Sequence, residues 1–186
     1  MMFASLFAMW TAMMAAMMLP GAAPAIARGA KGISRVGFAA AYLLIWTAFS
    51  AVAALAQVWL ERAALLSDSM ALHSSIAAGV VIIAVGLYQL TPAKRRALLE
   101  CRVRPADVPS SVGRSVVAGL RYGGACLASS AALMALLFVA GVMSYAWMVV
   151  IALWILAEKW LPWGVRLPRY VGVALIAWGG VVLAMP

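Results

Sequence analysis

Long apolar stretches alternate with short polar segments along the whole chain of 186 residues. Most stretches are close to the length of a membrane-crossing helix, which needs about 20 apolar residues, and the fifth is shorter and abuts Pro162. Backbone amides cannot face lipid unpaired, and the stretches are too long and continuous for barrel strands, so each predicts a helix. The predicted helices cover residues 2–19, 37–60, 70–90, 119–143, 146–160 and 170–185.

Composition restricts the class of protein. Hydrophobic residues make up 67% of the chain and charged residues 10%, whereas a soluble domain carries about 25% charged residues. So few charges cannot cover a wetted surface, and the two cysteines, Cys101 and Cys126, exclude a disulfide scaffold. We therefore expect an all-α membrane protein, a single domain over residues 1–186 with six transmembrane helices in a lipid bilayer.

The distribution of charge predicts the orientation. The net charge of +9 would suggest a nucleic-acid partner in a soluble protein, but in a bilayer it indicates basic cytoplasmic loops, so we expect no nucleic-acid partner. Of the 14 lysines and arginines, all except Arg62 fall on one side of the predicted helices. The positive-inside rule assigns that side to the cytoplasm and both termini to the outside.

A proline separates the third apolar stretch from a basic segment. Pro92 disfavours helical geometry in the residue before it and can itself open a new helix. Residues 93–101 then predict a short amphipathic helix, with Lys94, Arg95 and Arg96 reaching anionic headgroups. A docking surface for a cytoplasmic partner is the alternative.

Two glycines predict a contact between helices, and the absence of several motifs restricts the chemistry that the protein can carry out. Gly119 and Gly123 form a GxxxG pair that we expect to face another helix. The sequence contains one histidine and lacks a P-loop, a dinucleotide fingerprint and a CxxC motif. Its five acids lie at or beyond the ends of the apolar stretches, which predicts no buried carboxylate. We expect no enzymatic activity and no catalytic residue.

Methionines concentrate in the first predicted helix. Met9, Met13 and Met17 follow an i, i+4, i+8 spacing and share one face, and Met14 with Met18 forms a parallel stripe. Thioethers are soft ligands that suit Cu(I). The alternative is that these side chains only fill apolar space.

Two further residues extend the candidate metal ligands. His73 follows Met70 by three residues, and we place it one turn into the third helix, near its outer end, where the two side chains could hold copper. A histidine hydrogen-bonded at the interface, or an axial ligand of haem or chlorophyll, are the alternatives. Cys126, predicted at the level of Met13 and Met14, either completes a sulfur site within the bilayer or is a small buried hydrophobe.

Four stretches resemble, in this order, a bacterial family described as predicted metal-binding integral membrane proteins and sometimes as copper-chaperone-like. They are AMWTAMMAAMMLPGAAP (Ala8–Pro24), GLYQLTPAKRRALLECRVRP (Gly86–Pro105), GLRYGGACLASSAALMALLFVAGVMSYAWM (Gly119–Met148) and AEKWLPWG (Ala157–Gly164). The resemblance covers nearly the whole chain. It implies a copper-binding protein in the bacterial inner membrane, with the outside termini in the periplasm.

One departure from the family pattern bears on the metal ligands. Members usually read C-L-G-C-C where this chain has Cys126 followed by Leu-Ala and then Ser129 and Ser130. Serine hydroxyls are poorer copper ligands than thiolates. Two functions therefore remain. One is a copper-handling membrane protein without catalytic activity. The other is an accessory or scaffolding subunit that packs against other subunits of a membrane complex, for example one containing pigment or redox groups.

Overall fold

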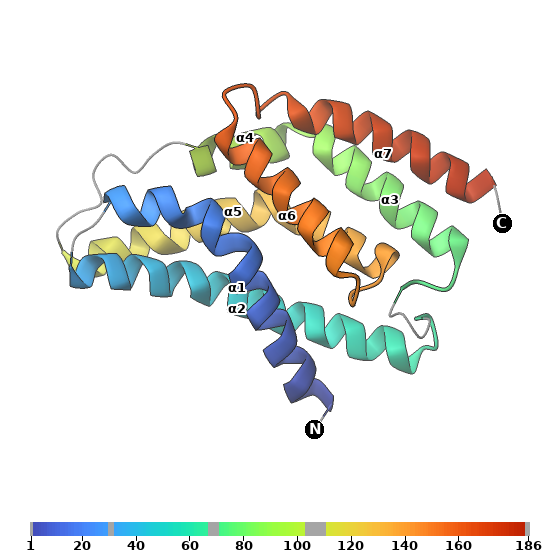
Figure 1. Cartoon of the computed structure of the whole chain (residues 1–186), viewed down its shortest axis with the longest axis horizontal. Coiled ribbons are helices and arrows are strands. Elements are labelled where there is room, and N and C mark those ends of the chain that lie inside the picture. Colours follow the sequence, from blue (N-terminus) through green and yellow to red (C-terminus); the bar gives the residue numbers. More distant parts are fainter. Residues whose placement is uncertain (1, 30–31, 67–70, 103–110, 185–186) are drawn as a thin grey trace. The chain divides into compact units, whose positions relative to one another are not determined.

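The computed structural model describes residues 2–29, 32–66, 71–102 and 111–184, and within these ranges the chain is helical without a β-strand (Figure 1). An isolated bridge pairs Leu66 with Leu72. The all-α prediction is confirmed for this part of the chain. The helices are α1 (Met2–Gly29), α2 (Ile33–Arg62), α3 (Ser75–Leu90), α4 (Pro92–Arg102), α5 (Val112–Ala140), α6 (Tyr145–Trp160) and α7 (Leu167–Ala184).

The helices group into two compact units. The first comprises Met1–Val58 and Glu100–Leu127, and so contains α1, most of α2 and the first half of α5. The second comprises Trp59–Leu99 and Ala128–Pro186, with α3, α6, α7, most of α4 and the second half of α5. The assignment of residues 1–186 to a single domain stays a prediction.

The first helix is longer than predicted. It continues through Pro20 and Pro24 to Gly29, and α2 starts at Ile33, so most of the predicted loop 20–36 is helical. Alanine is the best helix former and is abundant in this segment. Each proline removes one backbone N–H, a loss that apolar helices tolerate when neighbouring groups compensate.

Several helices have the length and apolarity of membrane spans. Among the described residues α1, α2, α5 and α7 qualify, and α3 with α4 makes a fifth if the bent pair is counted as one span. α6 has 16 residues, or about 24 Å of helix, which is less than the roughly 30 Å of bilayer hydrocarbon. The apolar helices are thus confirmed, whereas their arrangement as six spans stays a prediction.

Thr91 fixes the bend between α3 and α4, which is 64°. Its backbone N–H and its hydroxyl donate to the Tyr88 carbonyl at 3.0 and 2.7 Å and close α3. The same hydroxyl accepts the N–H of Lys94 at 3.2 Å and caps the first turn of α4. Pro92 is the first residue of α4, where a missing N–H costs nothing. The predicted end of one helix and start of another at Pro92 is confirmed.

The cations of α4 point in different directions. Arg95 and Arg96 are exposed, whereas the Lys94 side chain is completely buried. Successive helical residues are about 100° apart, so Lys94 shares a face with Ala97 and Leu98, which are buried as well. The prediction that all three cations reach headgroups is wrong for Lys94, because it followed adjacency in sequence rather than the face of the helix.

In the first unit, α2 and α5 approach closely at two glycines. A Cβ atom on Gly119 would collide with the carbonyl oxygen of Phe38, and one on Gly123 would lie 3.0 Å from the Ile45 side chain. Residues without a side chain allow such an approach of two backbones. The prediction that Gly119 and Gly123 face another helix is confirmed.

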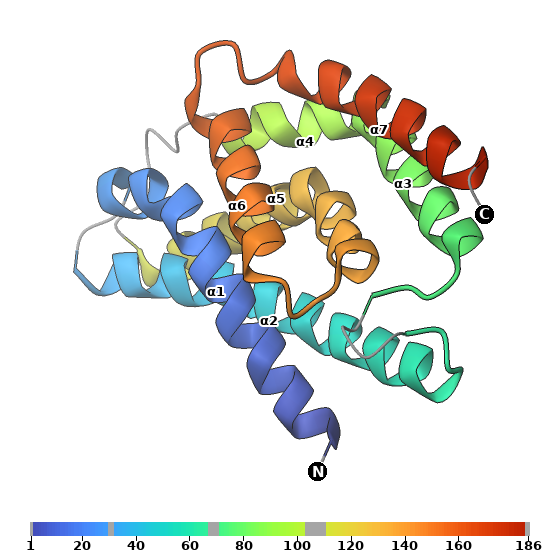
Figure 2. The same cartoon turned by 45° about the vertical axis from the view of Figure 1, so that its right-hand side comes forward.

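In the second unit, α3 and α7 lie side by side and antiparallel (Figure 1 and Figure 2). Gly86 faces Gly172, where a Cβ on either residue would lie 2.8 or 2.9 Å from the carbonyl oxygen of the other. Gly79 and Gly179 form an equivalent pair two turns away. These pairs were not predicted from the sequence, although the seven-residue glycine spacing in both helices was their signal.

Replacing Gly179 by alanine should therefore destabilise the protein. The new Cβ would lie 2.6 Å from the Ile83 side chain and 3.0 Å from the Gly79 carbonyl oxygen. We expect Gly179→Ala to cost on the order of 1–3 kcal/mol, the usual range for overpacking. Thermal unfolding in detergent measures this loss.

Gly180→Ala is the matched control, because a Cβ on Gly180 would meet nothing within 4 Å. The control gains the same helix propensity, about 1 kcal/mol at most. Equal unfolding temperatures for the two variants would contradict close backbone contact between α3 and α7.

Candidate functional site

One face of α1 is buried in the first unit and carries sulfur. Met14 and Met18 are 0% and 1% exposed, and Met17 at the edge of this face is 8% exposed. Met9 and Met13 lie one residue round the helix and are half-buried. The structure thus divides the five predicted methionine ligands into a buried group and a more accessible pair.

Two hydrogen bonds set the rotation of α1 against α2. The indole Nε1 of Trp10 donates to Oε1 of Gln57 at 2.7 Å. Two turns further along α1, the hydroxyl of Tyr42 donates to the Met18 carbonyl at 3.1 Å. Buried indole and phenol groups need such acceptors. Because Met14 lies between these two anchors, the bonds hold its face of α1 towards α2.

Cys126 joins the same cluster from α5. It is fully buried, and its Sγ lies 3.3 Å from the hydroxyl oxygen of Tyr42. Since the phenol proton is directed at the Met18 carbonyl, the thiol is the donor in this second contact. The Tyr42 hydroxyl therefore contacts both the Cys126 thiol of α5 and the Met18 backbone carbonyl of α1.

The second predicted ligand group differs from expectation. His73 does not lie within the third helix, because Ser74 caps α3 by accepting the N–H of Ala77 at 3.3 Å. The imidazole is exposed, and the backbone N–H of His73 donates to the Leu65 carbonyl at 2.9 Å. Met70 lies outside the described residues. Within the described ranges, no group of three or more His, Cys, Asp or Glu side chains could hold a metal ion.

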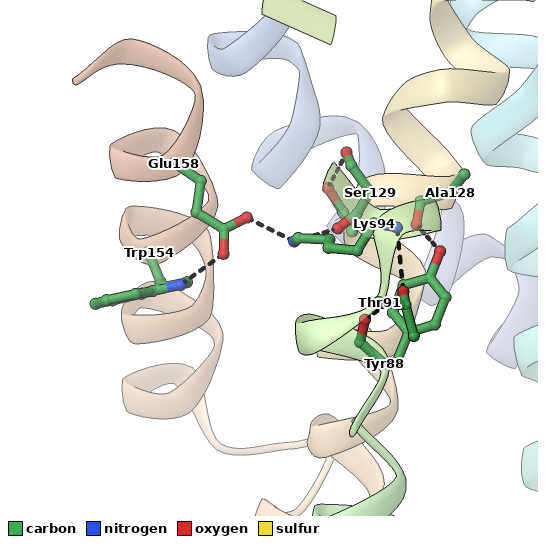
Figure 3. Close-up of polar contacts among 8 residues, drawn as sticks. Tyr88, Thr91, Lys94, Ala128, Ser129, Trp154 and Glu158 are labelled. Atoms are coloured by element: carbon green, nitrogen blue, oxygen red, sulfur yellow. Dashed lines mark hydrogen bonds and ion pairs between the residues drawn. The ribbon is translucent and has the colours of Figure 1, made fainter. Parts of the chain in front are cut away.

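The second unit contains a buried ion pair (Figure 3). Nζ of Lys94 lies 2.7 Å from Oε2 of Glu158, with side-chain exposures of 0% and 1%. The ammonium group also donates to the Ser129 carbonyl of α5 at 2.5 Å. The indole Nε1 of Trp154, one turn earlier on α6, donates to the other carboxylate oxygen at 2.9 Å. Each charge therefore has a counter-charge and a further hydrogen-bond partner.

Tyr88 adds a parallel contact between α3 and α5. Its hydroxyl donates to the Ala128 carbonyl at 2.6 Å, next to the Ser129 carbonyl that receives Lys94 (Figure 3). Two side chains from the two sides of the α3–α4 bend thus bind consecutive carbonyls of α5. Together with Glu158 they connect α3, α4, α5 and α6 within this unit.

This ion pair was missed by sequence analysis, and the expectation of no buried carboxylate is wrong for Glu158. The residue does lie near the end of its apolar stretch, as expected, but it faces Lys94 and not water. The available signal was the position of Lys94 on the apolar face of a short helix. A cation on such a face needs a buried acid.

Ser129 and Ser130, which follow Cys126 on α5, are both buried, at 1% exposure. Their hydroxyl oxygens lie 3.3 Å apart, and the carbonyl of Ser129 accepts the ammonium of Lys94. The contact with Lys94 is made by the backbone of Ser129 and does not depend on its side chain, and the buried thiol of α5 is Cys126.

Over its described residues the chain is an all-helical protein rich in apolar surface, with thioether and thiol side chains buried in its first unit. A family model described as PpoB2, copper chaperone, matches residues 7–182, and the chain belongs to this copper chaperone family. The search of curated proteins and the search of solved structures gave no match. The family places the chain among copper-handling proteins in a general sense.

Breaking the ion pair on one side should be costly. Glu158→Gln would leave the buried Lys94 ammonium without a counter-charge, and removal of one partner of a buried pair typically costs about 3–5 kcal/mol. We expect this loss in the free energy of unfolding measured in detergent.

The combined variant Lys94→Met with Glu158→Leu provides the control, since replacing both charges by apolar groups of similar volume is often close to neutral. It should be more stable than either single variant. Additive losses would show that the two side chains are not energetically coupled.

Proposed function

We propose that the chain binds Cu(I) as its cargo through Met14, Met18 and Cys126 and passes it to a partner protein. The observation that carries this proposal is the burial of the Met14, Met18 and Cys126 side chains in the first unit, where the Tyr42 hydroxyl contacts both the Met18 backbone carbonyl and the Cys126 thiol. Cu(I) is a soft ion that sulfur ligands select. Membership of a copper chaperone family supports the same metal.

The same geometry suits transfer. Two of the three proposed ligands are thioethers, which are neutral and weaker donors than thiolates, so a partner that offers more thiolates can take the ion. Met17, at the edge of the buried face, and the half-buried Met9 and Met13 supply further thioethers along α1. In this proposal the protein is a carrier without catalytic activity of its own.

We further propose that the protein works as a multi-pass protein of the bacterial inner membrane, in contact with other membrane proteins. Many large apolar side chains are on the outside of the helices. Leu44, Val52, Leu153 and Val173 are examples, each about 60% exposed. Extensive exposed apolar surface is rare in soluble monomers and fits a lipid environment. The positive-inside rule then favours periplasmic termini.

Substitution of the buried methionines tests the metal assignment. Met14→Leu with Met18→Leu conserves side-chain volume and should preserve the fold. We expect Cu(I) affinity, measured by competition with a chromogenic chelator, to fall by more than the roughly 10–100-fold that is typical for losing a group next to a metal ligand.

Met9→Leu with Met13→Leu is the matched control, with the same chemistry on the more accessible face of the same helix. It should retain tight Cu(I) binding. Equal affinities for the two double variants would contradict the assignment. Absence of Cu(I) binding in the unaltered protein would instead favour a scaffolding role in a membrane complex.

Cysteine labelling in a background with Cys101 and Cys126 replaced by serine tests the orientation. Arg96→Cys, on the exposed side of α4, should be protected from a membrane-impermeant maleimide in intact spheroplasts. Tyr145→Cys, at a position 80% exposed, should react. Reaction at both positions or at neither would contradict the proposed topology.

A further inference from the structure

A pocket of about 690 Å³ lies at the bend between α3 and α4, in the second unit. It is bounded by the end of α3, the start of α4, the turn after α6 and the start of α7. Three arginines line it: Arg95 from α4, Arg166 from the turn and Arg169 from α7. All three are exposed, and within the described part of the chain none of them forms an ion pair.

Gln89 gives this pocket a second, independent feature. The residue lines the pocket and is 2% exposed. Neither its side-chain nitrogen nor its side-chain oxygen has a hydrogen-bond partner among the described residues. Buried amides are nearly always hydrogen-bonded, because an unpaired one costs free energy. An unpartnered buried carboxamide beside three arginines is thus a second observation that points to a polar ligand.

We propose that this pocket binds a phosphate-bearing anion. Guanidinium groups match phosphate oxygens in geometry and charge, and three of them converge on one cavity. The Gln89 amide nitrogen would donate to a phosphate oxygen, and its carbonyl oxygen would accept from a hydroxyl or guanidinium group. The ligand chemistry is thus a phosphate ester or free phosphate, bound by Arg95, Arg166, Arg169 and Gln89.

The rest of the pocket lining favours a lipid source for the phosphate. Leu90, Val165 and Val173 add apolar surface next to the arginines. An anionic phospholipid carries a phosphate and an acyl chain at adjacent positions, so it would contact both parts of the lining. Free phosphate would use the polar part alone.

Ligand-induced stabilisation of the purified full-length protein tests the proposal. The unfolding temperature is followed in neutral detergent with added phosphatidylglycerol, phosphatidylcholine or inorganic phosphate. We expect phosphatidylglycerol to raise it more than phosphatidylcholine. Arg95→Gln should weaken phosphatidylglycerol binding by about three- to tenfold, allowing for screening of an exposed charge.

Arg96→Gln is the matched control, because Arg96 is the exposed neighbour of Arg95 and does not line the pocket. Stabilisation by inorganic phosphate that is also weakened by Arg95→Gln would support the site with free phosphate as its source. Equal effects of Arg95→Gln and Arg96→Gln would indicate general charge attraction and overturn the proposal.

Gln89→Leu provides a readout that a purely structural role would not give. Removing an unpaired buried amide should raise the unfolding temperature of the ligand-free protein, because the desolvated group disappears. The same variant should bind phosphatidylglycerol less tightly. A more stable variant with unchanged lipid affinity would show that Gln89 does not contact the ligand and would overturn the proposed site.

Discussion

A lysine ammonium buried in an apolar helical protein needs a counter-charge and hydrogen-bond acceptors within reach, and the second unit is organised around this requirement. Glu158 supplies the charge and the Ser129 carbonyl supplies an acceptor. The Thr91 hydroxyl caps the turn of α4 that carries Lys94. Desolvation of both ions costs several kcal/mol, so such a pair contributes more to the choice of one arrangement than to net stability.

The arrangement it selects is specific because apolar helices in lipid have little to distinguish one rotation from another. Leucine faces pack almost equally well in many registers, and lipid is as apolar as the helices themselves. A polar group that must meet one acceptor removes this freedom. Trp10 with Gln57, and Tyr42 with the Met18 carbonyl, have the same effect in the first unit. There they orient the methionine face of α1.

Local features were predictable from sequence, and long-range partners were not. The break at Pro92 follows from the covalent structure of proline, and the contact of Gly119 and Gly123 with a helix follows from their spacing. The burial of Lys94 was also encoded, in the apolar face it shares with Ala97 and Leu98. Its partner Glu158 is 64 residues away in sequence, and nothing in the local pattern of either segment identifies the other.

In the candidate metal site, too, the local spacing was predictable from the sequence and the long-range packing was not. The helical spacing of the methionines identified a stripe, but two adjacent stripes on α1 were equally regular. Burial separates them, and burial depends on α2 and α5. His73 was misplaced because the cap at Ser74 starts α3 after it. Met70, Ala71 and Leu72 extended the apolar stretch past the true start, although Ser74 is a residue type that favours the N-cap position.

Charge balance gives the proposed copper site a further physical constraint. A cation transferred into a low-dielectric interior is costly unless it is neutralised. Thioethers bring no charge, so Met14 and Met18 alone would leave Cu(I) as a buried monocation. A thiolate at Cys126 would make the complex neutral, since a metal-bound thiol loses its proton. Cu(II) at the same three ligands would still carry a net positive charge. In the proposed site, ligand softness and electrostatics would therefore both favour the reduced ion, and a Cys126 thiolate would supply the charge that the thioethers lack.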